Sequence, residues 1–142
     1  MKKLTTKLTI AATVLVAAAS VASAQMTAQI PFEFRVGNRV MAPGAYRVDS
    51  LETGSDTKVF RILDVHSHQS VAILPQARVD PQQGWRAEGN PKLLFACTSG
   101  RCALAQLWSG SESYAYQFAG PKLGKDEEAV LRVIPMQRDK AE

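Results

Sequence analysis

The sequence contains few of the residues on which common active sites depend. Among its 142 residues there are two histidines and two cysteines, so a three-histidine metal centre is excluded. No glycine-rich phosphate loop, haem signature or G-x-S-x-G nucleophile elbow occurs. Internal repeats, low-complexity tracts and long amphipathic helical patterns are also missing. Neither nucleotide chemistry nor a serine-nucleophile site is indicated, and we expect no cofactor.

Positive charge is concentrated at the N-terminus. The formal net charge is +4, and Lys2, Lys3 and Lys7 all contribute to it. Beyond them, basic residues are spaced among acidic ones and form no stripe of the kind that follows a phosphate backbone. We therefore expect no nucleic acid among the partners.

Residues 1–24 have the pattern of a secretory signal peptide. Two lysines precede an uncharged apolar core over residues 8–19, and Ala22-Ser23-Ala24 offers small residues to a signal peptidase. The apolar run is too short to span a bilayer comfortably. No cysteine directly follows, so a lipid anchor is not indicated. We expect cleavage before Gln25 and a secreted or periplasmic product that is not inserted in a membrane.

The remaining chain is predicted to be short β-strands separated by turns. Apolar and polar residues alternate over residues 30–36, the pattern of a strand with one buried face. Similar patterns predict strands over residues 45–51, 58–65, 70–74, 93–96, 103–108 and 114–118. Residues 75–91 are predicted to be the longest loop. Residues 126–128 suit either one helical turn or the approach to a closing strand over residues 130–134.

These features predict one all-β domain over residues 25–136. Turn signals recur about every eight to twelve residues, which favours an antiparallel β-sandwich or a small barrel of about seven to nine short strands. Residues 137–142 have nothing to bury and are predicted to be a frayed tail.

The two cysteines lie close together in the sequence, at Cys97 and Cys102. In an exported chain such a pair meets oxidising conditions. Strand-like flanks on both sides would bring the two residues face to face across a hairpin. A redox-active pair usually has the tighter C-x-x-C spacing, and two thiolates make only half of a zinc site. We therefore predict a structural disulfide.

Asp64, His66 and His68 are the strongest candidates for grouped metal ligands. In an extended chain, residues two apart share one face of a strand. Convergence on one tetrahedral ion would still require a ligand from another strand, and no further histidine exists to supply it. We predict no catalytic metal centre here, and at most weak, adventitious binding of Cu(II), Ni(II) or Zn(II).

Aromatic residues offer a possible binding surface. Trp85 lies in the predicted long loop, Trp108 at a strand end, and Tyr114 after a Gly-Ser turn. Rings of this kind stack on sugars or pack against a partner with little loss of entropy. The alternative for Trp108 is a place in the core.

Two segments together resemble a known group of proteins. Ile-Pro-Phe-Glu-Phe-Arg-Val-Gly over residues 30–37 and Pro-Gly-Ala-Tyr-Arg-Val over residues 43–48 are similar to the opening signature of small exported bacterial proteins abundant in soil bacteria. The pattern of that group is IPF-x-F-x-VG followed by PAG-x-Y-x-V, and this chain departs from it at Ala42-Pro43-Gly44. The resemblance implies an all-β fold and export, and it brings no catalytic residue.

The sequence therefore predicts a non-enzymatic exported β-domain with a binding or structural role at the cell envelope or outside. Its expected partner is an envelope or extracellular protein or a glycan. Two alternatives remain open: a small barrel that binds an apolar ligand, and a hydrolase whose site is not recognisable from sequence.

Overall fold

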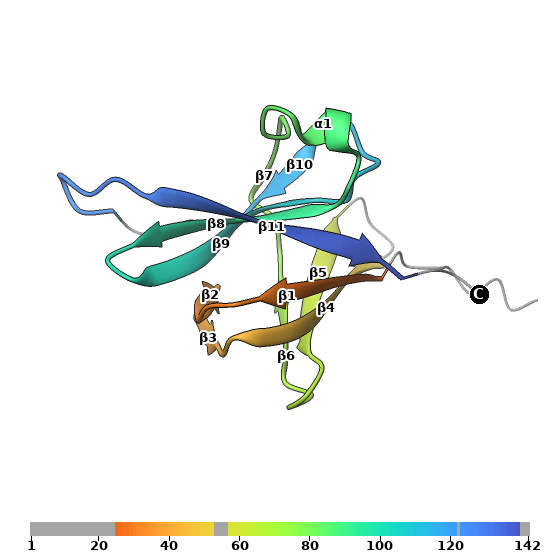
Figure 1. Ribbon diagram of the computed structural model, residues 1–142, viewed down its shortest axis with the longest axis horizontal. Helices are drawn as coiled ribbons and strands as arrows, with labels where there is room; N and C mark the ends of the chain where they lie inside the picture. The colour runs from red at the N-terminus through yellow and green to blue at the C-terminus, as the bar shows by residue number, and fades with distance from the viewer. Residues whose placement is uncertain (1–24, 53–56, 122, 140–142) are drawn as a thin grey trace, which may run out of the picture.

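The computed structural model describes residues 25–52, 57–121 and 123–139, and it is built almost entirely of β-structure (Figure 1). The predicted all-β fold is confirmed. One short helical turn interrupts the strands. The elements are β1 (Met26–Ile30), β2 (Phe34–Val36), β3 (Arg39–Met41), β4 (Gly44–Glu52), β5 (Lys58–Asp64), β6 (Ser70–Ile73), β7 (Ala77–Val79), α1 (Trp85–Glu88), β8 (Lys92–Thr98), β9 (Arg101–Trp108), β10 (Ala115–Gln117) and β11 (Val130–Arg138).

Nine of these strands form a sheet that curls into a nearly closed barrel. Their order is β3-β2-β9-β8-β11-β1-β4-β5-β6, and β10 and β7 extend the sheet beyond β9. Where the ends approach, the Arg39 guanidinium on β3 donates a hydrogen bond of 2.9 Å to the Ser70 carbonyl on β6. All pairings are antiparallel except that of β2 with β9, which is parallel. Of the two predicted architectures, sandwich and barrel, the structure is the barrel.

The predicted single strand over residues 30–36 is in fact two strands. β1 ends at Ile30 and pairs with β4 and β11, whereas β2 begins at Phe34 and pairs with β3 and β9. Pro31 lies at the break because it has no backbone N–H to donate to a ladder. Exposure still alternates over residues 30–36, so the apolar side chains stay inside the barrel while the chain passes from the partners of β1 to those of β2.

Aromatic side chains fill the barrel interior. The Phe34 ring lies 5.0 Å from the Tyr46 ring and 5.3 Å from the Phe95 ring, both at steep angles. Edge contacts of this kind contribute about 0.5–1.5 kcal/mol beyond burial itself. The largest fully buried side chains are Tyr46, Tyr116, Phe34, Phe95, Phe118, Ile30, Ile62, Leu93, Leu104 and Leu107. Since these side chains occupy the interior, it is not the place where we look for a ligand.

Two expected boundaries differ in the structure. The predicted long loop over residues 75–91 contains β7 and α1. β11 continues beyond the expected end of the domain, to Arg138, which pairs with Met26 on β1. Residues 130–135 of β11 pair with β8, and residues 136–138 pair with β1. The change of partner follows Pro135, and residues 137 and 138 belong to the barrel.

Candidate functional site

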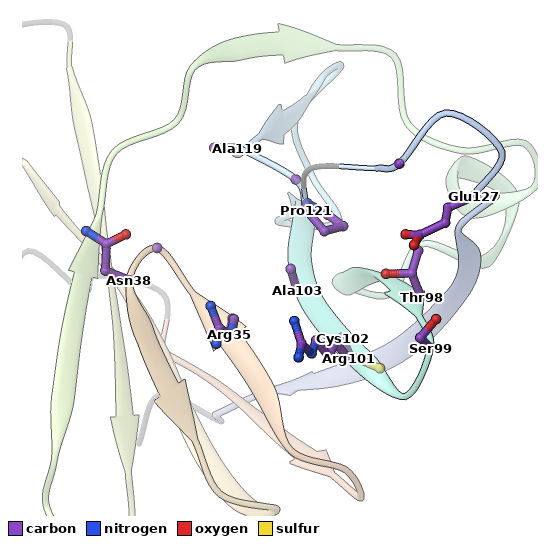
Figure 2. A pocket seen from close by; sticks show the side chains of 13 residues that line it. Arg35, Asn38, Thr98, Ser99, Arg101, Cys102, Ala103, Ala119, Pro121 and Glu127 are labelled. Atoms are coloured by element: carbon purple, nitrogen blue, oxygen red, sulfur yellow. The ribbon is translucent and has the colours of Figure 1, made fainter.

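The main cavity lies on the outer face of the sheet, beside the β8–β9 hairpin. It encloses about 700 Å³, which is within the range of small-molecule and peptide sites. β2, β9 and residues 119–121, 124 and 127 surround it (Figure 2). It is lined by Arg35, Gly37, Asn38, Thr98, Ser99, Arg101, Cys102, Ala103, Ala119, Gly120, Pro121, Gly124 and Glu127. We call this cavity the outer cleft.

Two arginines face the outer cleft from neighbouring strands. In the parallel pairing of β2 with β9, Arg35 lies opposite Ala103. Arg101 is two residues before Ala103 and therefore projects from the same face of β9. Both arginines are exposed, whereas Phe34 and Cys102 beside them point into the core. The register thus places the two arginines diagonally across the β2–β9 pair, and both line the outer cleft.

Within the described ranges, neither Arg35 nor Arg101 has a hydrogen-bond or ion-pair partner. The cleft does contain one acidic side chain, Glu127, at its loop side (Figure 2). Guanidinium groups present planar pairs of donors that match carboxylate and phosphate oxygens. The arrangement is therefore suited to holding an anionic group.

A second, smaller hollow adjoins the outer cleft. It encloses about 110 Å³ and is lined by Glu33, Phe34, Arg35, Gly100, Arg101 and Cys102. Both hollows share Arg35, Arg101 and Cys102. The two arginines therefore lie between the hollows.

The hairpin that carries Arg101 is held at two points. Ser99 and Gly100 have φ angles of 48° and 77°, which is the left-handed pair of a two-residue hairpin turn. The sulfur atoms of Cys97 and Cys102, which lie opposite each other in the register, are 2.09 Å apart. The predicted disulfide is confirmed. The strands extend past both cysteines to Thr98 and Arg101, so Ser99 and Gly100 alone form the turn.

Asp64 and the two histidines form a turn. One Asp64 carboxylate oxygen accepts hydrogen bonds from the backbone N–H groups of His66 (2.9 Å) and Ser67 (3.3 Å). The hydrogen bond from His66 is the main reason that the pKa of Asp64 is lowered. Among the described residues, no cluster of three His, Cys, Asp or Glu side chains is placed to hold a metal ion. The Asp64 carboxylate therefore stabilises the turn that connects β5 and β6.

Neither tryptophan offers a binding surface, and for Trp108 the alternative of a place in the core is confirmed. Trp85 is 4% exposed and Trp108 is 2% exposed. Their rings stack at 6.1 Å under α1, together with Leu94 and Ala115. Trp85 escaped prediction because a single helical turn is too short to show a period. Tyr114 is half-buried beside Arg78, whose guanidinium lies 4.5 Å from the ring centre.

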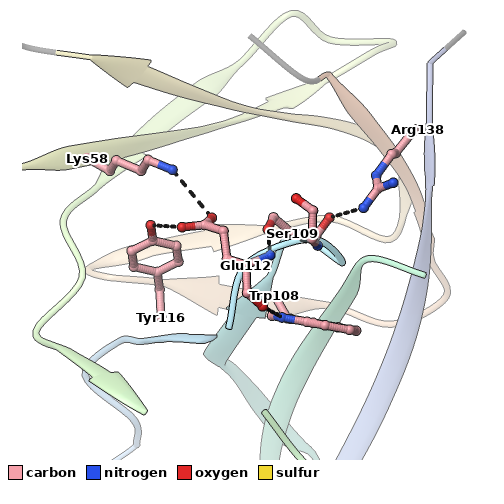
Figure 3. Close-up of polar contacts among 7 residues, drawn as sticks. Lys58, Trp108, Ser109, Glu112, Tyr116 and Arg138 are labelled. Carbon is pink, nitrogen blue, oxygen red and sulfur yellow. Dashed lines mark hydrogen bonds and ion pairs between the residues drawn. The ribbon is translucent and has the colours of Figure 1, made fainter. Parts of the chain in front are cut away.

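A polar network fixes the turn after β9 (Figure 3). The Glu112 carboxylate accepts a hydrogen bond of 2.7 Å from the Tyr116 hydroxyl and pairs with Lys58 at 3.4 Å. Its backbone carbonyl accepts a hydrogen bond from the Trp108 indole. Burial disfavours ionisation of Glu112, but hydrogen bonds from Tyr116 and Tyr114, together with the charge of Lys58, outweigh burial and lower the pKa. Burial, followed by the bond to Glu112, raises the pKa of Tyr116. Glu112 therefore stabilises the turn after β9.

Sequence reasoning did not single out Arg35 or Arg101. The alternation around each residue indicates an outward side chain, but only the parallel β2–β9 pairing brings the two together.

No family model, curated protein or solved structure matches this chain. In the part of the chain that the structure describes, no helix has the length and apolar character needed to cross a membrane.

Proposed function

We propose that this protein is an exported, non-enzymatic binding domain whose outer cleft holds an anionic group of its ligand. The observation that carries the proposal is that Arg35 and Arg101, two exposed residues on paired strands, lack counter-ions among the described residues and border the same cavity of about 700 Å³. Hydrogen bonds from guanidinium to carboxylate or phosphate are among the stronger ones in proteins. An anion in this position would relieve the mutual repulsion of the two arginines.

A binding role is favoured over catalysis by the state of three acidic residues outside the cleft. Asp64 accepts hydrogen bonds from its own turn, and Glu112 is engaged by Tyr116 and Lys58. Asp49 is 3% exposed and accepts a hydrogen bond of 3.1 Å from Arg61 on the adjacent strand. Each of these carboxylates has a role in maintaining the fold.

Export is supported by the signal-like residues 1–24 and by the Cys97–Cys102 disulfide, a bond typical of oxidising compartments. Protein recovered from the periplasm or medium of an expressing cell should begin at Gln25, as measured by intact mass. A chain that stays in the cytosol with residues 1–24 attached would contradict export.

The anion site can be tested by an NMR titration of the exported protein with succinate, a small dicarboxylate. Saturable shifts are expected at the backbone amides of residues 98–103, and they should be lost in Arg35→Gln and in Arg101→Gln. Lys125→Gln is the matched control, because it removes a positive charge from the adjoining loop without lining the cleft. Shifts that do not saturate, or that survive both arginine substitutions, would refute the anion site.

A further inference from the structure

The outer cleft and the smaller hollow together form a groove with an ordered charge pattern. The arginine pair is shared by both hollows, whereas Glu127 lines only the larger and Glu33 only the smaller. Both glutamates are exposed, and neither is ion-paired to an arginine within the described ranges. The groove therefore presents a negative, a positive and again a negative charge.

Two of these charges, those of Glu33 and Arg35, are spaced as in an extended polypeptide. Glu33 and Arg35 are two residues apart and both exposed, whereas Phe34 between them is buried. Side chains two residues apart in an extended chain point the same way and are separated by about 6.5–7 Å. A ligand in the same conformation would repeat this spacing and could match each charge in turn.

A uniformly anionic chain fits this pattern poorly. An acidic polysaccharide or a nucleic acid would place like charges beside Glu33 and Glu127 while it met the arginines. A protein segment can alternate its charges, with an acidic side chain at the centre and basic ones on both sides. Small and polar side chains at Ala103, Ala119 and Thr98 leave room for its backbone.

From this charge order we infer that the groove binds an extended segment of a partner protein in which one acidic side chain lies between two basic ones. The inference rests on the proposed function, since the acidic side chain occupies the anion site. The central carboxylate pairs with Arg35 and Arg101, and the flanking cations pair with Glu33 and Glu127.

The test is fluorescence anisotropy of the exported protein with labelled, end-capped peptides at low ionic strength. The probe is Lys-Gly-Asp-Gly-Lys, and the comparison peptides are Lys-Gly-Asn-Gly-Lys and Glu-Gly-Asp-Gly-Glu. Unlabelled oligogalacturonate, an acidic glycan, serves as competitor. We expect the first peptide to bind most tightly, and Arg35→Gln or Arg101→Gln to weaken it by about tenfold or more.

The glutamates distinguish the inference from the proposed function. Glu33→Gln and Glu127→Gln should each weaken the first peptide by about two- to fivefold, the effect of one exposed ion pair, and should strengthen the all-acidic peptide. Glu128→Gln is the matched control, since this exposed neighbour lines neither hollow.

Three results would overturn the inference, and one of them would also refute the proposed function. If the all-acidic peptide or oligogalacturonate binds as tightly as the first peptide and still depends on the arginines, the inference is overturned and the anion site stands. If the glutamate substitutions change nothing, the flanking contacts do not exist and the inference also fails. If no probe binds in an arginine-dependent way, both the inference and the proposed function are refuted.

Discussion

The ion pair between Lys92 and Glu88 has two unequal halves. The Lys92 side chain is 7% exposed, whereas that of Glu88 is 57% exposed. Lys92 lies on β8 opposite Trp108, so its charge is enclosed next to the tryptophan stack under α1. A buried ammonium group depends on its partner much more than an exposed carboxylate does.

Removing Glu88 should therefore lower the unfolding free energy more than removing Lys92. Glu88→Gln leaves the ammonium group of Lys92 buried without a negative charge. Loss of one partner from a fully buried pair costs about 3–5 kcal/mol. Because water screens the exposed glutamate, we expect about 1–2 kcal/mol here. Lys92→Met keeps an unbranched side chain of similar length that needs no partner, so its unfolding free energy should stay within about 1 kcal/mol of wild type.

Urea unfolding measured by tryptophan fluorescence is a suitable assay, because Trp85 and Trp108 are buried and stacked in the native state. The double variant Glu88→Gln/Lys92→Met should match Lys92→Met alone, since no unpaired ammonium group remains. If Lys92→Met is the more destabilising single change, or if the two effects simply add, the assignment of the cost to a stranded buried charge is wrong.

Three further changes test other parts of the fold. Replacing Cys97 and Cys102 together by Ser should lower the unfolding free energy by about 2 kcal/mol and weaken succinate binding, as measured by urea unfolding and NMR; unchanged values would show that the disulfide does not support the hairpin. Gly110→Ala should lower the unfolding free energy by about 2 kcal/mol or more, because the φ of Gly110 is +86° and a Cβ there would lie 2.9 Å from a backbone nitrogen. A Cβ at Gly100 would meet no atom within 4 Å, so Gly100→Ala should lower the unfolding free energy by only about 1 kcal/mol. Equal shifts of the melting temperature in the two variants would contradict this. The lowered pKa of Glu112 means that its carboxylate stabilises the folded state above the unfolded pKa of about 4.3, and that this stabilisation is lost as the pH falls through the lower folded pKa. Glu112→Gln should therefore flatten the decline of stability below about pH 5, and an unchanged pH profile would refute that role.

Local patterns sufficed where a strand alternates buried and exposed residues. Alternation of buried Tyr46 and Val48 with exposed Arg47 is directly visible in the sequence, as is the short hairpin around Cys97 and Cys102. These features depend on neighbouring residues alone, so a single chain is enough to predict them.

Features that depend on distant pairing were not predictable. Pro31 indicates an edge or a strand start, but the sequence cannot say that the chain leaves β1 for a different set of partners there. The polar neighbours of Trp85 in the sequence suggest an exposed side chain, yet the Trp85 ring, which lies on α1, stacks on Trp108. In both cases the deciding contact is made with residues far away in the chain.

The location of the candidate site follows from the size of the barrel. The domain is small, and its interior is filled by the aromatic and aliphatic side chains that stabilise it, so a ligand has to be bound from outside. An outer face of a sheet is mostly flat, and a recess forms only where another element rises above it. Here the end of the disulfide-linked hairpin and residues 119–121, 124 and 127 line the recess together with β2. The outward positions between them, Arg35 and Arg101, contribute nothing to the core. They are therefore free to be charged, and their charge is available to a partner.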